Sequence, residues 1–256
     1  YHEWEYYHEP TADYIIVDEI QDFDRQEIQS FMNAAKRHYL FFGDSAQSIY
    51  KHFGRNTLTI EEIAKLTKLT PLRLYNNYRL PRNIAKITQD YVGVDVMPYK
   101  EKVYLNKEKD IPYIVHFNSD DLQLKAIADV IASYKGNTIG VLLPSNEKVL
   151  KISEGLLKMG VDLEYRCKTN AADKRSQDNI NFYHDNPKVL TYHSAKGLQF
   201  DIVILPSYEG ASSEDSRKAL YVAMTRSMHK LYIMYTTKEL TFPLSKVPPR
   251  LYKKDI

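Results

Sequence analysis

The sequence predicts an α/β protein built on mostly parallel, doubly wound sheets. Short apolar segments alternate along the chain with amphipathic segments of helical period. Most of the apolar segments have no polar residue inside them, which is typical of strands that helices cover on both faces of a parallel sheet. The regular alternation of the two patterns indicates consecutive βαβ units, and such units wind into a parallel sheet.

The first two expected strands are residues 14–17 and 39–42, and residues 26–37 between them have the spacing of an amphipathic helix. Further strands are expected at residues 113–117, 139–143, 189–192, 202–205 and 231–235. Further helices are expected at residues 81–91, 122–134, 147–158 and 216–227. Residues 93–110 and 168–186 are polar, so we expect both segments to cross the surface.

Composition limits the class of protein. A chain of 256 residues that is 43% hydrophobic can bury a sizeable core and is long enough for two domains. The formal net charge is only +2, so a nucleic-acid site would have to be a local patch. The single cysteine, Cys167, cannot form an intramolecular disulfide, which favours a reducing, cytoplasmic compartment. No apolar segment reaches the ~20 residues that span a bilayer, so we expect no membrane partner.

Two acidic residues, Asp18 and Glu19, follow the first expected strand directly. Ligands bind at the carboxyl ends of the strands in open α/β sheets. There Asp18 could hold Mg²⁺, usually through water, while Glu19 could orient or deprotonate an attacking water. By itself this pair also fits a solvated acidic turn. The polar residues 43–50 follow the second strand at the same edge and favour a nucleotide site.

Five short motifs occur along the chain: VDEIQD at 17–22, GDSAQSIY at 43–50, NNYR at 76–79, TYHSAKGLQFD at 191–201 and LYVAMTR at 220–226. In this order they resemble motifs II to VI of the UvrD/Rep-like superfamily 1 DNA helicases. The resemblance implies the C-terminal portion of such a helicase. Residues 1–74 would be a partial first RecA-like motor domain, and residues 75–256 a second RecA-like motor domain that includes the linker helix. ATP, Mg²⁺ and single-stranded or partly duplex DNA are the implied cofactors and partner.

The resemblance also implies roles for residues of a nucleotide site. Asp18 corresponds to the Mg²⁺ partner and Glu19 to the catalytic base. Gln21 and Gln47 correspond to residues that contact or sense the γ-phosphate and its water, and an amide can donate and accept a hydrogen bond at the same time. A surface or helix-cap residue is the alternative for Gln47.

Further nucleotide contacts are implied in the second domain. Arg79 and Arg226 resemble two arginine fingers, because a guanidinium donates two hydrogen bonds to phosphate and keeps its charge. Without the resemblance, each would be read as part of a surface ion pair. Tyr78 corresponds to a residue that stacks on adenine, with a core tyrosine as the alternative. Gly197 and Gln199 belong to the same nucleotide-binding set, although Gln199 stands where relatives usually carry a glutamate that holds a ribose hydroxyl.

Four residues are implied in DNA binding. Thr191 and His193 correspond to polar residues that touch single-stranded DNA, with a turn histidine as the alternative for His193. His52 stands where many relatives have a tryptophan that stacks on bases, and either His52 or Phe53 could replace it.

The sequence contains no G-x-x-x-x-G-K-[ST] segment, the loop that cradles the phosphates of a nucleotide. In the family this loop precedes the Asp-Glu strand, so we expect it upstream of Tyr1. The expected function is therefore the C-terminal part of an ATP-dependent DNA helicase or translocase that moves on single-stranded DNA and that, alone, does not hydrolyse ATP. The alternatives are a non-catalytic nucleotide- or DNA-binding scaffold of helicase fold and an unrelated nucleotide-dependent enzyme.

The missing loop also affects folding. We expect its strand to lie between the strands at 14–17 and 39–42, so its loss would leave them without a shared neighbour. The first domain is then expected to be rearranged, paired with another chain or less stable than the second.

Overall fold

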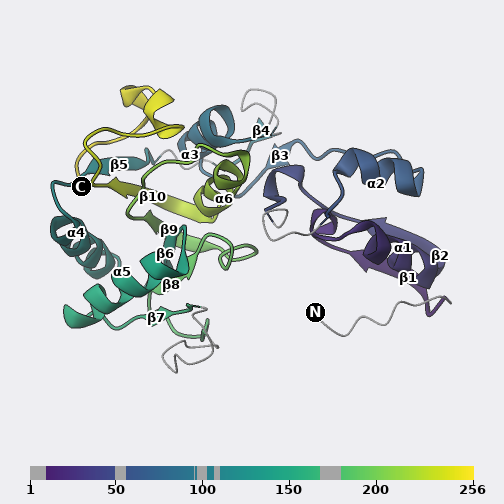
Figure 1. Cartoon of the computed structure of the whole chain (residues 1–256), viewed down its shortest axis with the longest axis horizontal. Coiled ribbons are helices and arrows are strands. Elements are labelled where there is room, and N and C mark those ends of the chain that lie inside the picture. The colour runs from purple at the N-terminus through teal and green to yellow at the C-terminus, as the bar shows by residue number, and fades with distance from the viewer. Residues whose placement is uncertain (1–9, 50–55, 95, 97–102, 107–109, 168–179) are drawn as a thin grey trace. The chain divides into compact units, whose positions relative to one another are not determined.

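A computed structural model of the chain describes residues 10–49, 56–94, 96, 103–106, 110–167 and 180–256. The chain divides into two units, Tyr1–Leu74 and Tyr75–Ile256 (Figure 1). The strands that pair in each unit run parallel and alternate with helices, so the predicted α/β class is confirmed. His52 and Phe53 lie outside the described residues.

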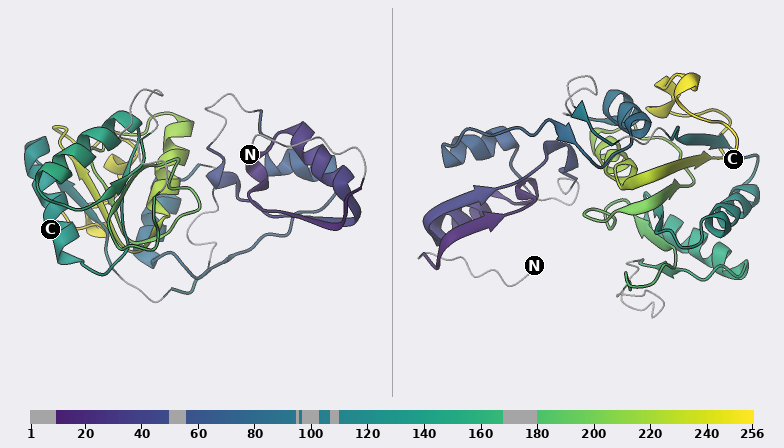
Figure 2. Two further views of the ribbon diagram at one scale, coloured as in Figure 1. Left: turned by 90° about the horizontal axis from the view of Figure 1, so that it is seen from below. Right: turned by 180° about the vertical axis from the view of Figure 1, so that it is seen from behind.

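The first unit contains a single βαβ motif. Strand β1 (Ala12–Val17) pairs in parallel with β2 (Ala35–Phe41), and α1 (Arg25–Ala34) connects them and lies on one face of the pair (Figure 2). The helix begins at Asp24, whose side chain accepts hydrogen bonds from two backbone N–H groups of the first turn in a capping box. Buried side chains from β1, α1 and the segments that follow each of the two strands form a small core: Val17, Ile20, Ile28, Phe31, Leu58 and Ile63.

The first helix is shorter than the sequence predicted. We expected a helix over 26–37, but α1 ends at Ala34, and residues 35–37 already belong to β2. The backbone of β2 pairs with β1 from Ala35 onward. Tertiary pairing of this kind overrides a local helical pattern, because strand stability depends on the neighbouring strand.

The expected position of the phosphate-loop strand is wrong. Strands β1 and β2 are hydrogen-bonded to each other directly, with Tyr14 opposite His38 and Val17 opposite Phe41. No strand can lie between them. A further strand of this sheet could be added only at an outer edge.

The described part of the first unit also contains two short 3-10 helices and a second α-helix. The 3-10 helices η1 (Ile20–Asp22) and η2 (Ser45–Gln47) follow β1 and β2. Helix α2 (Ile60–Thr67) was not predicted, although Thr59 and Glu62 form a capping box at its start.

The second unit is built on a six-stranded sheet in which every pair of neighbours is parallel. Across the sheet the order is β5 (Tyr113–His116), β10 (Ser227–Tyr235), β9 (Phe200–Leu205), β6 (Ile139–Leu143), β8 (Lys188–Thr191) and β7 (Glu164–Tyr165). The five strands predicted for this part of the chain are confirmed, and β7 is an additional short one. Burial of every residue in β6 agrees with a strand covered on both faces.

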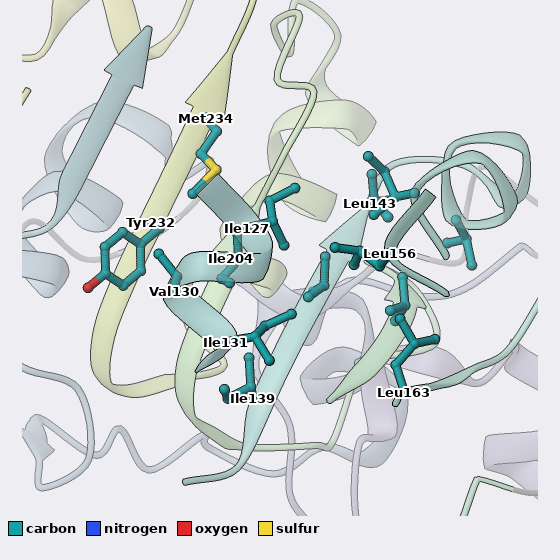
Figure 3. Close-up of a cluster of buried hydrophobic side chains, with 14 of the residues drawn as sticks. Ile127, Val130, Ile131, Ile139, Leu143, Leu156, Leu163, Ile204, Tyr232 and Met234 are labelled. Carbon is teal, nitrogen blue, oxygen red and sulfur yellow. The ribbon is translucent and has the colours of Figure 1, made fainter. Parts of the chain in front are cut away.

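Helices cover both faces of this sheet. Helices α4 (Asp120–Ser133) and α5 (Asn146–Lys158) lie on one face, and α6 (Glu214–Met224) and α3 (Arg82–Ile87) on the other (Figure 1). Helix α3 continues as a π-helical turn, Thr88–Val92. Figure 3 shows the core under α4 and α5, where side chains of both helices interdigitate with those of the central strands.

The polar segment 93–110 contains a strand that the sequence did not indicate. Strand β4 (Val103–Tyr104) pairs in parallel with β3 (Asn76–Asn77), and Tyr104 is buried. Residues 244–246 and 249–251 form two 3-10 helices near the C-terminus. None of the helices within the described ranges has the length and apolarity needed to cross a membrane.

The core under α5 provides a test of the packing. Leu156 is fully buried, whereas the next residue, Leu157, is 44% exposed. We expect Leu156→Ala to lower the free energy of unfolding of the second unit by about 2–5 kcal/mol, because it removes buried methyl groups and leaves a cavity. Leu157→Ala should change it by less than about 1 kcal/mol. Urea unfolding followed by circular dichroism measures both, and equal losses would contradict the packing described.

The uncovered face of β1 and β2 should promote association. Ile16 and Leu40 lie opposite each other on this face and are 67% and 54% exposed, whereas Ile15 packs against the small core. We expect the double variant Ile16→Thr, Leu40→Thr to reduce concentration-dependent self-association without loss of stability, because threonine retains β propensity. Sedimentation velocity tests this. The control Ile15→Thr should instead destabilise the first unit, and unchanged association of the double variant would contradict the expectation.

Candidate functional site

The turn after β1 presents the two acidic residues. Asp18 is exposed and its Oδ1 accepts a hydrogen bond from the backbone N–H of Glu19 at 2.8 Å. Glu19 has a left-handed backbone, with φ 54° and ψ 40°. This conformation is uncommon for a residue other than glycine, and such residues cluster at functional sites. The chain therefore turns sharply at Glu19 and enters η1.

The turn after β2 lies against this acidic turn. Gln21 is 1% exposed, and its Nε2 donates to Oε2 of Glu19, while its Oε1 accepts from the backbone N–H of Asp44 at 3.0 Å. Gln47 Nε2 donates to Asp44 Oδ2 at 3.0 Å. The structure thus brings Glu19, Gln21 and Gln47 together at the carboxyl edge of the two strands, beside Asp18. It also turns Gln21 inward, so that both ends of its amide are engaged within the protein rather than facing a phosphate.

Sequence reasoning missed Asp44. Its Oδ1 accepts the N–H of Ala46 at 3.0 Å and so caps η2, and its Oδ2 holds Gln47. The signal was present in the motif GDSAQ, because an aspartate three residues before Gln47 can both cap the turn and reach the amide.

The carboxyl edge of β1 fits Mg²⁺ that binds together with a nucleotide. Mg²⁺ uses one or two carboxylates, several waters and the phosphates of its substrate. The exposed carboxylate of Asp18 can supply one such ligand. Within the part of the chain that the structure describes, no three His, Cys, Asp or Glu side chains are grouped so that they could hold a metal by themselves.

In the second unit, two asparagines hold the turn that carries Tyr78 and Arg79. Asn77 Oδ1 accepts the N–H groups of Arg79 and Leu80 at 3.1 and 2.9 Å, and Asn106 Nδ2 donates to the carbonyl of Arg79 at 2.6 Å. Tyr78 is 71% exposed, which excludes the alternative that it is a core residue. Asn106 had no sequence signal, because it reaches Arg79 only through the pairing of β3 and β4.

Arg226 is 2% exposed, which excludes a surface ion pair. Its Nε donates to the carbonyl of Val222 at 3.0 Å and its Nη1 to that of Leu198 at 3.4 Å. Its Nη2 donates to Thr225 Oγ1 at 3.1 Å. A guanidinium held in this way must exchange some of these bonds before it can donate to a phosphate.

The motif around Thr191 spans both edges of the second sheet. Thr191 ends β8 at the carboxyl edge, and its Oγ1 accepts the N–H of Ser194 at 3.1 Å, which stabilises the turn that carries the half-buried His193. The same motif reaches the amino edge at Gln199, which is exposed. Gly197 between them has a φ of 82°, a value that favours glycine.

Within the six-stranded sheet, Gln199 and Arg226 lie at a different edge from Thr191 and His193. Tyr78 and Arg79 are outside this sheet, because they follow β3, which pairs with β4. The N–H of Phe200, the first residue of β9, donates to the carbonyl of Arg226 at 3.0 Å. Gln199 and Arg226 are therefore neighbours at the amino edge, whereas Thr191 and His193 lie at the carboxyl end of β8.

Each of the two units contains a segment that matches a model of a known protein family. A model of the UvrD/REP helicase N-terminal domain corresponds to residues 4–68, and a model of the UvrD-like helicase C-terminal domain to residues 188–234. Each of the two units thus contains a segment similar to the UvrD/Rep-like helicases. This similarity supports a DNA-helicase type of function in general terms.

Two relatives illustrate the similarity. The ATP-dependent DNA helicase PcrA of Staphylococcus aureus strain Mu50 is 37% identical over 82 residues, which cover 26% of this chain and 11% of PcrA. The RecB subunit of the RecBCD enzyme of Chlamydia pneumoniae is 37% identical over 70 residues, covering 26% of this chain and 6% of RecB. The chain therefore aligns with only about a tenth of the length of PcrA.

A solved structure shares the fold. The C-terminal domain of a possible DNA helicase from Lactobacillus plantarum WCFS1 superimposes with a TM-score of 0.50 at 22% identity. The match covers 70% of this chain and 98% of the bacterial domain. At this level of identity the likeness concerns the fold.

The hydroxyl of Thr225 provides a test of how Arg226 is held. Thr225 Oγ1 donates to the carbonyl of Val222 at 2.8 Å and accepts from Arg226. Thr225→Val keeps the shape but removes both bonds, so the second unit should lose about 1–3 kcal/mol of unfolding free energy. Thr225→Ser keeps the hydroxyl and should cost only about 1 kcal/mol. Urea unfolding compares the two, and equal losses would show that the hydroxyl does not hold the guanidinium.

Proposed function

We propose that this chain is the C-terminal part of an ATP-dependent DNA helicase or translocase that couples ATP hydrolysis to movement on single-stranded DNA. The observation that carries the proposal is the hydrogen-bonded cluster of Glu19, Gln21, Asp44 and Gln47 beside the exposed Asp18. The similarity of both units to UvrD-like helicase domains supports the same function. A compartment that keeps Cys167 reduced, such as the cytoplasm, suits its single buried thiol.

The first unit would supply the groups that act on the attacking water. Glu19 orients the water and accepts its proton, while Gln47 contacts the γ-phosphate or the water. Asp18 would hold Mg²⁺, and the bound ion would supply charge neutralisation at the transferred group. The left-handed backbone at Glu19 supports its role as the base, because uncommon backbone conformations cluster at functional sites.

The second unit would supply the positive charge and the remaining nucleotide contacts. Arg79 and Arg226 act as arginine fingers that stabilise the charge developing on the transferred phosphoryl group. The exposed ring of Tyr78 stacks on the adenine, and the exposed Gln199, next to Gly197, accepts a hydrogen bond from a sugar hydroxyl.

Single-stranded or partly duplex DNA would bind at the carboxyl edge of the second sheet. His193 contacts phosphate or sugar from the turn after β8, and Thr191 fixes that turn. His52 or Phe53 would add a stacked base. Because Thr191 and Gln199 lie at the two ends of one loop, this loop links the DNA contacts to the nucleotide contacts.

A scaffold of helicase fold that binds without catalysis is the second candidate. It is favoured by the lack of a G-x-x-x-x-G-K-[ST] loop in these 256 residues. The geometry around Glu19 favours catalysis, because a scaffold has no need for a strained acidic turn that a buried amide holds.

Substitution of the arginines in a full-length protein that carries a phosphate-binding loop tests the proposal. Arg79→Ala and Arg226→Ala should each lower kcat by about 10³–10⁵ and change KM for ATP much less, because the guanidinium acts mainly in the transition state. The exposed Arg250→Ala is the control and should behave as wild type. Turnover is measured with single-stranded DNA present, and DNA affinity is measured without nucleotide. A near-normal kcat for both variants would make these arginines structural and favour the scaffold.

A further inference from the structure

The side chain of Gln21 is buried and hydrogen-bonded within the protein, so it does not offer a contact at the surface. Only 1% of the residue is exposed, so its amide has almost no surface on which to meet a phosphate. Its Nε2 donates to Glu19 Oε2, and its Oε1 accepts the N–H of Asp44. Both ends of the amide are therefore used to join the turn after β1 to the turn after β2.

The neighbouring glycine is required for this arrangement. A Cβ atom on Gly43 would lie 2.6 Å from Oε1 of Gln21 and 2.8 Å from Cγ2 of Ile20. Contacts this short do not occur in proteins without a shift of the atoms involved. Any larger residue at position 43 would push the amide of Gln21 away from Asp44. The close approach of the two turns thus depends on Gly43.

The bonds form a continuous path between two proposed reactants. Glu19 is bonded to Gln21, Gln21 to the backbone of Asp44, and the side chain of Asp44 to Gln47. Glu19 sits in a left-handed turn, which costs free energy and has to be held by surrounding contacts. Gln21 supplies such a contact from inside the protein.

We propose that Gln21 is a positioning residue that orients the carboxylate of Glu19 and links it, through Asp44, to Gln47. The proposal rests on the proposed function of Glu19 as the base. A primary amide suits the position because it donates to a carboxylate and accepts from a backbone N–H at once, which neither a carboxylate nor an apolar side chain can do. A change at Gln47 would then alter the direction of the Glu19 carboxylate.

The hydrogen bond itself can be tested in the 256-residue chain. NMR should show a Gln21 side-chain N–H that exchanges at least tenfold more slowly than that of the exposed Gln26 on α1. Glu19→Ala should remove most of this difference, because it removes the acceptor. A Gln21 amide that exchanges as fast as that of Gln26 in the wild-type chain would overturn the proposal.

The consequence for catalysis can be tested in the complete protein. Gln21→Met keeps the length of the side chain and removes both hydrogen bonds, so kcat should fall about 10–100-fold with KM for ATP nearly unchanged. Gly43→Ala should produce the same pattern without altering any proposed reactant, which covers the case in which Gln21→Met fails to fold. Gln26→Met is the matched control and should have wild-type activity. Adding Gln21→Met to Glu19→Ala should cause no further loss, because a positioning residue acts through the residue that it holds.

Three results would contradict the proposal, and each would point to a different role for Gln21 or Glu19. A rise in KM at unchanged kcat for Gln21→Met would show that Gln21 binds the nucleotide directly. A further large loss in the double variant would show that Gln21 acts independently of Glu19. Full activity of Glu19→Ala would overturn the proposed function itself, and the NMR comparison would then still report whether the hydrogen bond exists.

Discussion

The direct parallel pairing of β1 with β2 is the constraint on which the candidate site depends. Parallel strands end at the same edge, so the turn at Asp18 and Glu19 necessarily lies beside the turn at Gly43 and Asp44. The side-chain amide of Gln21 therefore joins the turn after β1 to the turn after β2, by bonding Glu19 in one and the backbone of Asp44, 23 residues after Gln21, in the other. Without this register the acidic turn would be a solvated loop end.

In the second unit, too, parallel strands place their ends at common edges of the sheet, but the candidate residues lie at both the carboxyl edge and the amino edge. The loop after Thr191 starts at the carboxyl end of β8 and finishes at the amino end of β9, where the backbone of Arg226 is bonded to Phe200. Residues proposed to meet DNA and residues proposed to meet nucleotide therefore belong to one continuous segment.

Much of the second unit was predictable from sequence pattern. Strand β6 was predicted over its whole length, because a continuously apolar segment between polar turns has few alternatives. Pattern failed where a distant partner decided the outcome. Residues 35–37 read as helix but pair with β1, and the polar segment 93–110 contains β4 because it pairs with β3. Without the resemblance, Arg226 would be interpreted as part of a surface ion pair, yet it is buried and donates to the carbonyls of Val222 and Leu198.

The sequence by itself determined the α/β class, the resemblance to UvrD/Rep-like helicases and the residue types at the site, because apolar periodicity and short motifs are local properties of the chain. Only the tertiary structure decided that Gln21 faces Glu19 and Asp44 and that Gly43 must lack a side chain there. Those facts depend on distances between turns that are remote in the sequence. Strand register and close packing set these distances, and a short sequence motif alone specifies neither of them.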